Sequence, residues 1–141
     1  MIRMTLFMNS QFSIAVHILS LLSLEEDPVS SQYIASSVNS NPSLVRKICR
    51  YLKNGQFITS TQGVTGYKLT QSASQILLGE VFRYTTDIDS HFVKIHEDTN
   101  THCPVGKNIT PALNDIYTEV DTSIINKLNT YTIEDVTNRF E

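Results

Sequence analysis

The segment 41–53, Asn-Pro-Ser-Leu-Val-Arg-Lys-Ile-Cys-Arg-Tyr-Leu-Lys, constrains the fold more than any other stretch of the chain. When the segment is plotted at about 100° per residue, its apolar side chains fall within one arc and its basic and hydroxyl side chains fill the opposite arc. One face can therefore enter a core while the other faces solvent or a polyanion. Most helices with this pattern are solvated surface helices, so the neighbouring elements decide the interpretation.

Two helical segments are predicted before this one. Residues 9–24 carry an apolar stripe of helical period, and Asn9 or Ser10 is suited to the N-cap. Residues 29–38 predict a helix of about two turns that begins with a serine cap. A polar turn follows, and Pro42 is well placed as the first residue of the amphipathic helix.

A β-hairpin is predicted directly after the amphipathic helix. Gly55 is expected to end that helix in the left-handed conformation. Residues 57–61 and 67–70 read as strands, and the turn 62–66 between them is bracketed by glycines. Two helices joined by a tight turn and followed by a hairpin form a winged helix-turn-helix. The predicted fold class is mostly α with a small β-hairpin.

Charge is strongly segregated along the chain, although the net charge is only -3. The segment 28–79 contains no Asp or Glu and carries +5, whereas residues 80–141 hold five basic and eleven acidic side chains. A local basic patch of this kind is the electrostatic footprint that phosphates require. An acidic protein partner would suit the same patch.

A long apolar stripe of helical period follows in the C-terminal part, with spacings of 4, 3, 4, 4, 4 and 3 residues from Ile109 to Tyr131. The helix is expected to begin at Pro111 or to bend there. At some 20 residues it would be about 30 Å long, which exceeds what the winged-helix module can cover. We expect this helix to form a dimer interface, because reading palindromic DNA requires a two-fold partner, and packing within the chain is the alternative. The positions assigned to that interface are Ile109, Leu113, Ile116, Val120, Ile124 and Leu128.

The chain is thus divided into a DNA-binding domain at 1–85, a loop at 86–107 that is a candidate sensor region, and a C-terminal part at 108–141. The C-terminal part holds the dimerisation helix and a short capped helix that begins near Thr132 and is suited to docking on the partner.

Several other classes of protein do not fit the sequence. No apolar run approaches the roughly 20 residues that cross a bilayer, so we expect a cytoplasmic protein without a membrane partner. The chain has two cysteines, which imply no disulfide framework. It has no paired carboxylates, phosphate-binding glycine loop or Ser/His/Asp set at a recognisable spacing, so no enzyme is expected.

In the order of its motifs the chain resembles the Rrf2 family of bacterial winged-helix transcription regulators, which includes the iron-sulfur cluster regulator, the nitric-oxide-sensitive repressor and the cysteine-metabolism repressor. The resemblance rests on Phe-Ser-Ile-Ala-Val at 12–16, Tyr-Ile-Ala at 33–35, Leu-Val-Arg-Lys-Ile at 44–48, Gly-Tyr-Lys-Leu at 66–69 and Cys-Pro-Val-Gly at 103–106. It implies a homodimer whose third helix lies in the major groove and whose wing approaches the minor groove.

The sequence departs from this family in the loop before the long helix. Members that hold an iron-sulfur cluster have three cysteines there, whereas Cys103 stands alone. A cluster needs about four ligands, normally thiolates, and His91, His96 and His102 have no metal-ligand spacing. We therefore expect no cofactor and no metal. The wing also departs, because Val64 and Thr65 separate its glycines.

Cys103 is a candidate redox sensor. It precedes a predicted helix, with His102 beside it and Lys107 nearby, and such surroundings lower the pKa of a thiol. The alternative is an inert small residue. Cys49 lies at the edge of the apolar arc and is expected to pack inside.

The sequence favours a homodimeric DNA-binding regulator, a repressor that reads a palindromic operator in double-stranded DNA. A protein-binding adaptor built on the same scaffold is the alternative. Side chains of the amphipathic helix would reach base edges and phosphates, and others would anchor the DNA backbone. The residues assigned to DNA are Ser31, Gln32, Ser43, Arg46, Lys47, Arg50, Lys53, Thr65 and Lys68.

Overall fold

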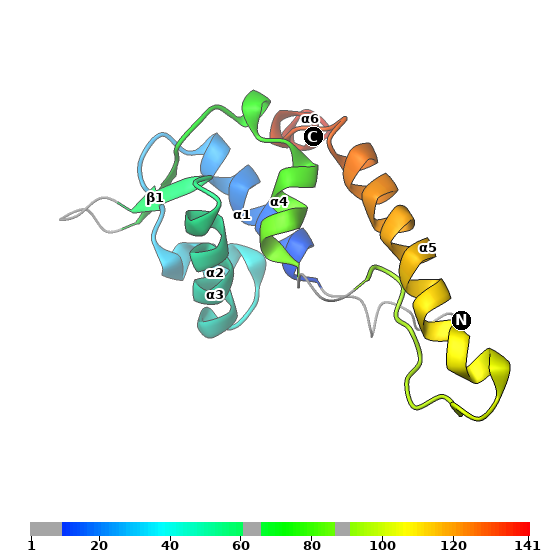
Figure 1. Cartoon of the computed structure of the whole chain (residues 1–141). Coiled ribbons are helices and arrows are strands. Elements are labelled where there is room, and N and C mark those ends of the chain that lie inside the picture. Colours follow the sequence, from blue (N-terminus) through cyan, green and yellow to red (C-terminus); the bar gives the residue numbers. More distant parts are fainter. Residues whose placement is uncertain (1–9, 61–65, 87–90) are drawn as a thin grey trace.

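The computed structural model describes residues 10–60, 66–86 and 91–141 of the chain (Figure 1). Its first three helices are α1 (Gln11–Leu24), α2 (Ser31–Val38) and α3 (Pro42–Asn54). Their positions confirm the prediction of a short helix, a turn and an amphipathic helix after an initial helix. A compact body forms around α1, α3 and α4 (Leu78–Thr85), and one long helix projects from it.

The helix caps agree with the sequence at α2 and α3. The Ser30 hydroxyl accepts from the Tyr33 backbone N–H at 3.1 Å, and Asn41 Oδ1 accepts from that of Leu44 at 2.8 Å. At α1 the N-cap is Ser10, whose side chain makes no cap hydrogen bond, and Asn9 lies outside the described residues. The cap bonds of α2 and α3 satisfy backbone N–H donors that a helix leaves unpaired in its first turn.

The C-terminal end of α3 differs from the prediction. Gly55 is not left-handed, since its φ is -80°, and the next residue, Gln56, takes the positive φ of 63°. A Cβ on Gly55 would lie 2.5 Å from the Phe57 ring and 2.9 Å from that of Tyr84. The glycine therefore allows two aromatic rings to approach closely, and the reversal of the chain occurs one residue later.

A two-stranded antiparallel hairpin follows, made of β1 (Ile58–Ser60) and β2 (Tyr67–Leu69), with Ile58 opposite Leu69. β1 begins one residue later than predicted and β2 ends one residue earlier, and residues 61–65 lie outside the described residues. Tyr67 also pairs with Val29, through N–H···O distances of 3.0 and 2.8 Å. This pairing attaches the hairpin to the segment between α1 and α2.

Residues 73–85 form two short elements. A 3₁₀ turn, η2 (Ala73–Gln75), is followed by extended backbone and then by α4. The extended part pairs with the C-terminal segment, because the Ile133 N–H donates to the Ile76 carbonyl and the Leu78 N–H donates to that of Tyr131, both at 3.0 Å. Backbone pairing with a distant segment thus separates η2 from α4.

The short C-terminal helix, α6 (Ile133–Thr137), belongs to the core of its own chain. Its capping box is present, since Thr132 accepts from the Asp135 N–H and the Asp135 carboxylate accepts from the Thr132 N–H. Ile133 is fully buried in the same cluster as Ile18 and Ile76. Ile133 thus completes the core of the compact body of its own chain, while docking of this helix on a partner stays a prediction.

The long helix α5 (Pro104–Leu128) begins within the segment 86–107 that was expected to be a loop, and it continues through Pro111. None of its 25 residues is buried, and only its C-terminal end packs on the body, against α4 (Figure 1). Gly79 of α4 permits this contact, because a Cβ there would lie 2.5 Å from the Ile125 carbonyl oxygen. Within the described part of the chain, no helix is both long and apolar enough to cross a membrane.

Candidate nucleic-acid interface

The two faces of α3 are separated as the sequence predicts. Val45, Ile48 and Leu52 are fully buried, while Arg46 and Arg50 are exposed on the opposite side. Burial of the apolar arc holds the helix on the body, so the orientation of the basic face is set by the core.

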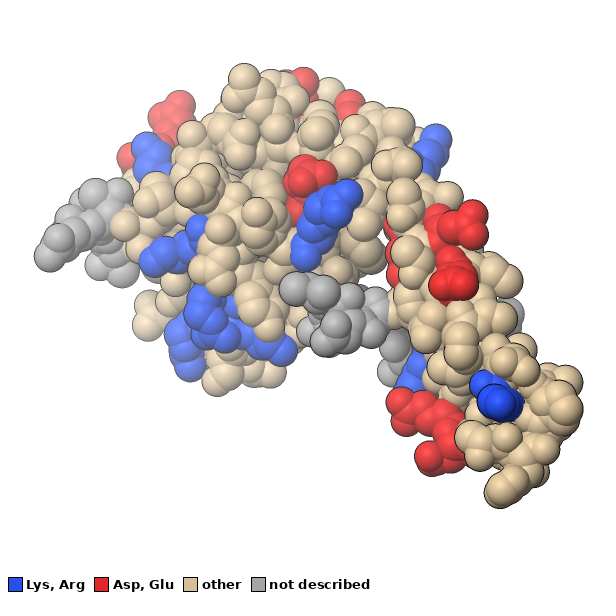
Figure 2. Space-filling view, viewed as in Figure 1, with Lys and Arg blue, Asp and Glu red and all other residues tan. Residues whose placement is uncertain are grey.

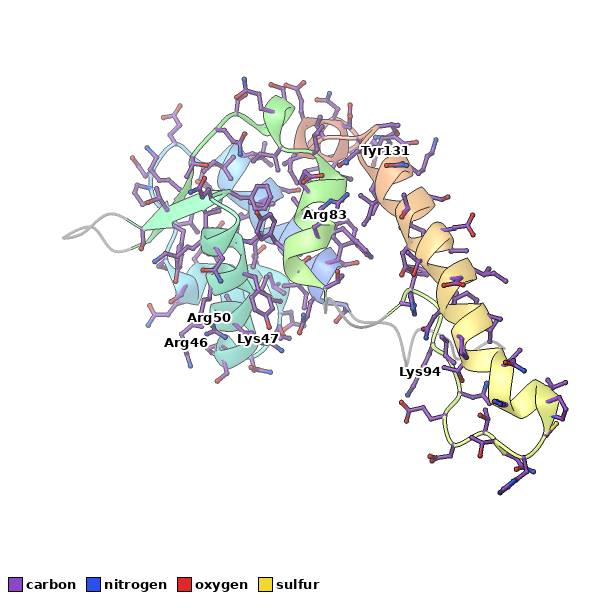
Figure 3. All side chains as sticks on the ribbon, viewed as in Figure 1. Arg46, Lys47, Arg50, Arg83, Lys94 and Tyr131 are labelled. Atoms are coloured by element: carbon purple, nitrogen blue, oxygen red, sulfur yellow. The ribbon has the colours of Figure 1, made fainter. Side chains whose placement is uncertain are left out.

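Lys and Arg side chains gather over α3 at the lower end of the compact body, whereas acidic side chains lie along the projecting α5 (Figure 2). Arg46 and Arg50 extend from one side of α3 and Lys47 from the other (Figure 3). The segregation of charge along the sequence thus becomes a segregation in space. Such a patch raises the local concentration of a polyanion.

Arg46, Lys47 and Arg50 each have a contact with a neighbour on the same helix. The Tyr51 ring, half-buried, lies 5.8 Å from Lys47 Nζ and 5.9 Å from Arg50 Cζ. Arg46 Nη2 donates to the Ser43 hydroxyl at 3.3 Å. Contacts between a cation and the face of an aromatic ring restrict the rotamers of long side chains without neutralising their charge.

Lys47 differs from its two neighbours because it is half-buried. Its ammonium donates to Gln11 Oε1 at 2.9 Å, and Gln11 Nε2 donates to the Thr85 carbonyl at 3.0 Å. Gln11 was not among the residues expected to matter. A signal was present, however, because Gln11 is a polar residue on the stripe that continues through the buried Ala15 and Ile18.

The other described residues assigned to DNA lie on α3, β2 and α2. Lys53, near the end of α3, donates to the Ser60 hydroxyl of β1 at 3.0 Å, and Lys68 is exposed on β2. Ser31 is the first residue of α2, and Gln32 follows it with an exposed side chain. Thr65 lies outside the described residues.

The two cysteines have opposite environments. Cys103 is exposed at the N-cap of α5, and the backbone N–H groups of Gly106 and Val105 lower the pKa of its thiol. Cys49 is buried in the core, as expected, and burial raises the pKa of its thiol to about 11. The thiolate is the reactive form, so Cys103 is the chemically competent cysteine.

The segment before α5 is held against that helix by His91. Its Nδ1 lies 2.6 Å from Asp121 Oδ2, its Nε2 lies 3.1 Å from Asn114 Oδ1, and the Phe92 N–H donates to Asp121 Oδ1 at 2.9 Å. The hydrogen bond with Asp121 raises the pKa of His91. No sequence pattern indicated this contact, because it joins residues that are distant along the chain.

The apolar stripe of α5 remains accessible except at Leu128, which packs against the core of its own chain. Ile116 is 52% exposed, and the other five positions assigned to the dimer interface are half-buried. A shallow hollow on this face is lined by Ile116, Val120 and Ile124 together with the polar residues Glu119, Ser123 and Lys127. An accessible apolar stripe on a long helix is the kind of surface that a second helix covers.

The family model Rrf2, described as that of iron-dependent transcriptional regulators, matches residues 8–139. The chain belongs to the Rrf2 family of transcriptional regulators. Among proteins of this kind, YwnA of Bacillus subtilis (strain 168), a candidate HTH-type transcriptional regulator, is 40% identical over 130 residues, which are 92% of this chain and 96% of YwnA.

Solved structures resemble this Rrf2 protein over nearly its whole length. That of a candidate DNA-binding protein has a TM-score of 0.73 at 36% identity and covers 90% of this chain and 98% of its own. CymR (YrzC), the global cysteine regulator of B. subtilis, has a TM-score of 0.67 at 20% identity and covers 95% of this chain and 98% of its own. The fold is therefore the winged helix-turn-helix of Rrf2 regulators, with a long C-terminal helix.

The description of the Rrf2 family names iron, and the cysteines of this member do not fit an iron-sulfur cluster. The whole chain has two cysteines, and one of them, Cys49, is buried in the core. Nowhere in residues 10–60, 66–86 and 91–141 do three or more His, Cys, Asp or Glu side chains come together in a way that could hold a metal ion. Cys103 alone cannot supply the roughly four thiolate ligands of an iron-sulfur cluster.

Proposed function

We propose that this Rrf2 protein is a homodimeric repressor that binds a palindromic operator in double-stranded DNA. The observation that carries the proposal is the basic face of α3, which is exposed above a buried apolar arc inside a segment without Asp or Glu. In helix-turn-helix proteins the second helix of the motif enters the major groove. Here that helix is α3.

In this proposal the basic residues have two kinds of role. Arg46 and Arg50 face the base edges, where a guanidinium can bind guanine through two parallel hydrogen bonds. Other side chains bind phosphates and set the position of the protein on the duplex. The residues of this second kind are Ser31, Gln32, Ser43, Lys47, Lys53, Thr65 and Lys68.

Dimerisation uses the apolar stripe of α5 in this proposal. The stripe is supported as an interface because no residue of α5 is buried within its own chain. A two-fold axis between two α5 helices would present two α3 helices to one face of a duplex. Half-sites of such operators are about 34–36 Å apart, one turn of DNA.

Cys103 makes the protein responsive to thiol oxidation in this proposal. Its exposure and the backbone N–H groups of Gly106 and Val105 favour the thiolate, which attacks oxidants. An oxidised sulfur at the start of α5 would change the helix end that lies farthest from the body. Loss of the dimer geometry, and hence of operator binding, is the expected consequence.

Selection of bound duplexes from a random pool tests the proposal. The wild-type protein should enrich a sequence with two-fold symmetry, and Arg46→Ala should lose the enrichment at one or more positions of each half-site. Arg83→Ala is the matched control, because Arg83 pairs with Glu80 at 3.3 Å on α4 and lies away from α3 (Figure 3). Absence of any enriched duplex would favour a protein-binding adaptor.

A further inference from the structure

Lys47 is held by a side chain from another helix, unlike the two arginines beside it. Figure 3 shows Lys47 on the side of α3 that faces the lower ends of α1 and α4. Its Nζ donates to Gln11 Oε1 at 2.9 Å. A lysine that is free on a helix surface samples many rotamers, so this contact selects one position for the ammonium.

The hydrogen bonds with Lys47 and Thr85 fix the orientation of the Gln11 amide. The Lys47 ammonium can only donate, and the Thr85 carbonyl can only accept. The amide must therefore turn its oxygen to Lys47 and its NH₂ group to Thr85, where the distance is 3.0 Å. Gln11 is 9% exposed, so water competes little for either bond.

The anchor behind Gln11 is rigid. Thr85 is fully buried at the end of α4, and its hydroxyl donates to the Val81 carbonyl at 2.8 Å. Gln11 itself starts α1, whose buried face continues into the core. The position of the Lys47 ammonium is thus defined by α1 and α4 together and does not depend on α3 alone.

We infer that Gln11 is a positioning residue that holds Lys47 ready to bind one backbone phosphate of DNA. The inference rests on the proposed function and refines it. An ammonium has three donors, of which Gln11 occupies one, so donors remain for a phosphate oxygen. Its side of α3 differs from that of Arg46 and Arg50, which assigns Lys47 to the DNA backbone and leaves base reading to the arginines.

A double-mutant cycle tests the inference, with affinity for one duplex measured by fluorescence anisotropy. Gln11→Met, which keeps the length of the side chain, should weaken binding of all duplexes alike by about 3- to 10-fold, since Lys47 must then lose its rotamer freedom on binding. Lys47→Met should weaken binding and lower the salt slope by about 1. In the Lys47→Met background, Gln11→Met should have no further effect on affinity.

Lys53→Met is the matched control background, because Lys53 lies on the same helix and contacts Ser60. There the effect of Gln11→Met should be as large as in the wild type. An equal effect of Gln11→Met in all three backgrounds would overturn the inference and leave the proposed function intact. A wild-type protein without salt-dependent duplex binding would overturn both.

Gln11→Glu provides a second arm if Gln11→Met does not fold at the assay temperature, which its melting curve would show. Glutamate keeps an oxygen that accepts from Lys47 but brings a negative charge towards the DNA. Its effect on affinity should therefore be larger in the Lys47→Met background, where no ammonium neutralises it. An equal effect with and without Lys47 would again overturn the inference.

Discussion

His91 Nδ1 and Asp121 Oδ2 lie 2.6 Å apart and join the segment before α5 to the middle of that helix. The two side chains are 21% and 24% exposed, so solvent reaches the pair but does not surround it. The Tyr117 ring packs edge-on against the imidazole at a centroid distance of 6.0 Å. The order of the segment that leads to Cys103 therefore depends on a titratable group.

The contact should weaken as the pH rises. The hydrogen bond with Asp121 raises the pKa of His91. The contact therefore stabilises the folded protein fully below about pH 6.5, the ordinary pKa of histidine, and this stabilisation is lost as the pH rises through the raised pKa. Asp121→Asn keeps an acceptor for the Phe92 N–H but removes the charge. An NMR titration should therefore find a lower pKa for His91 in this variant.

Asp115→Asn is the control for this titration, because Asp115 is an exposed acid on the same helix. In the Asp115→Asn variant, His91 should titrate as in the wild type. If Asp121→Asn left the titration midpoint of His91 unchanged, the ion pair would not be the cause of the raised pKa.

Cys103 should be alkylated in the native protein at a lower pH than an unperturbed cysteine. Backbone N–H groups at the start of α5 lower the pKa of its thiol. Cys49 should react only on unfolding, since it is buried and burial raises the pKa of its thiol to about 11. Iodoacetamide labelling as a function of pH, followed by mass spectrometry of the peptides that contain Cys103 and Cys49, measures the reactivity of each cysteine.

Cys103→Ser separates reactivity from regulation. The variant should bind the operator as the wild type does, yet keep this binding after peroxide treatment. An unchanged loss of binding on oxidation would show that Cys103 is not the sensor.

The sequence predicts α3 and its surroundings well because the relevant signals are local. An asparagine cap, Pro42 and the helical spacing of Val45, Ile48 and Leu52 act within one segment. The left-handed residue at the end of α3 is Gln56 and not Gly55, and Gly55 instead permits the close approach of Phe57 and Tyr84, which no local pattern shows.

Features that depend on distant pairs could not be predicted in this way. Ile133 is buried because its N–H pairs with the Ile76 carbonyl, and local pattern shows only a capped helix. The contact of Lys47 with Gln11 likewise requires α1 and α3 to be packed together. At the candidate interface, the sequence therefore indicates which residues are basic but not which of them are held in place.

Arg50→Ala should reduce discrimination at one base pair of each half-site by about 1–3 kcal/mol, because a bidentate contact with guanine would be lost. Anisotropy with a set of singly substituted duplexes measures this change. Lys68→Ala is the comparison, since loss of a phosphate contact should weaken all duplexes alike. A uniform loss of affinity in Arg50→Ala would assign Arg50 to the backbone as well.

Ile116→Asp should convert the protein to monomers. Ile116 is 52% exposed in its own chain, so its replacement leaves the fold intact, while burying an unpaired carboxylate at an interface costs on the order of 3 kcal/mol, roughly a hundredfold in affinity. Sedimentation velocity measures the change. Asn126→Asp, an exposed position outside the stripe, is the control and should remain dimeric. A dimeric Ile116→Asp protein would place the interface elsewhere.

The salt dependence of duplex binding tests the central claim most directly. Three phosphate-binding lysines per protomer, Lys47, Lys53 and Lys68, would make about six phosphate contacts per dimer, so affinity should fall by about 1,000-fold between 50 and 200 mM salt. The logarithm of the binding constant should decrease linearly with the logarithm of the salt concentration. A slope near zero would contradict the assignment of the α3 face to DNA.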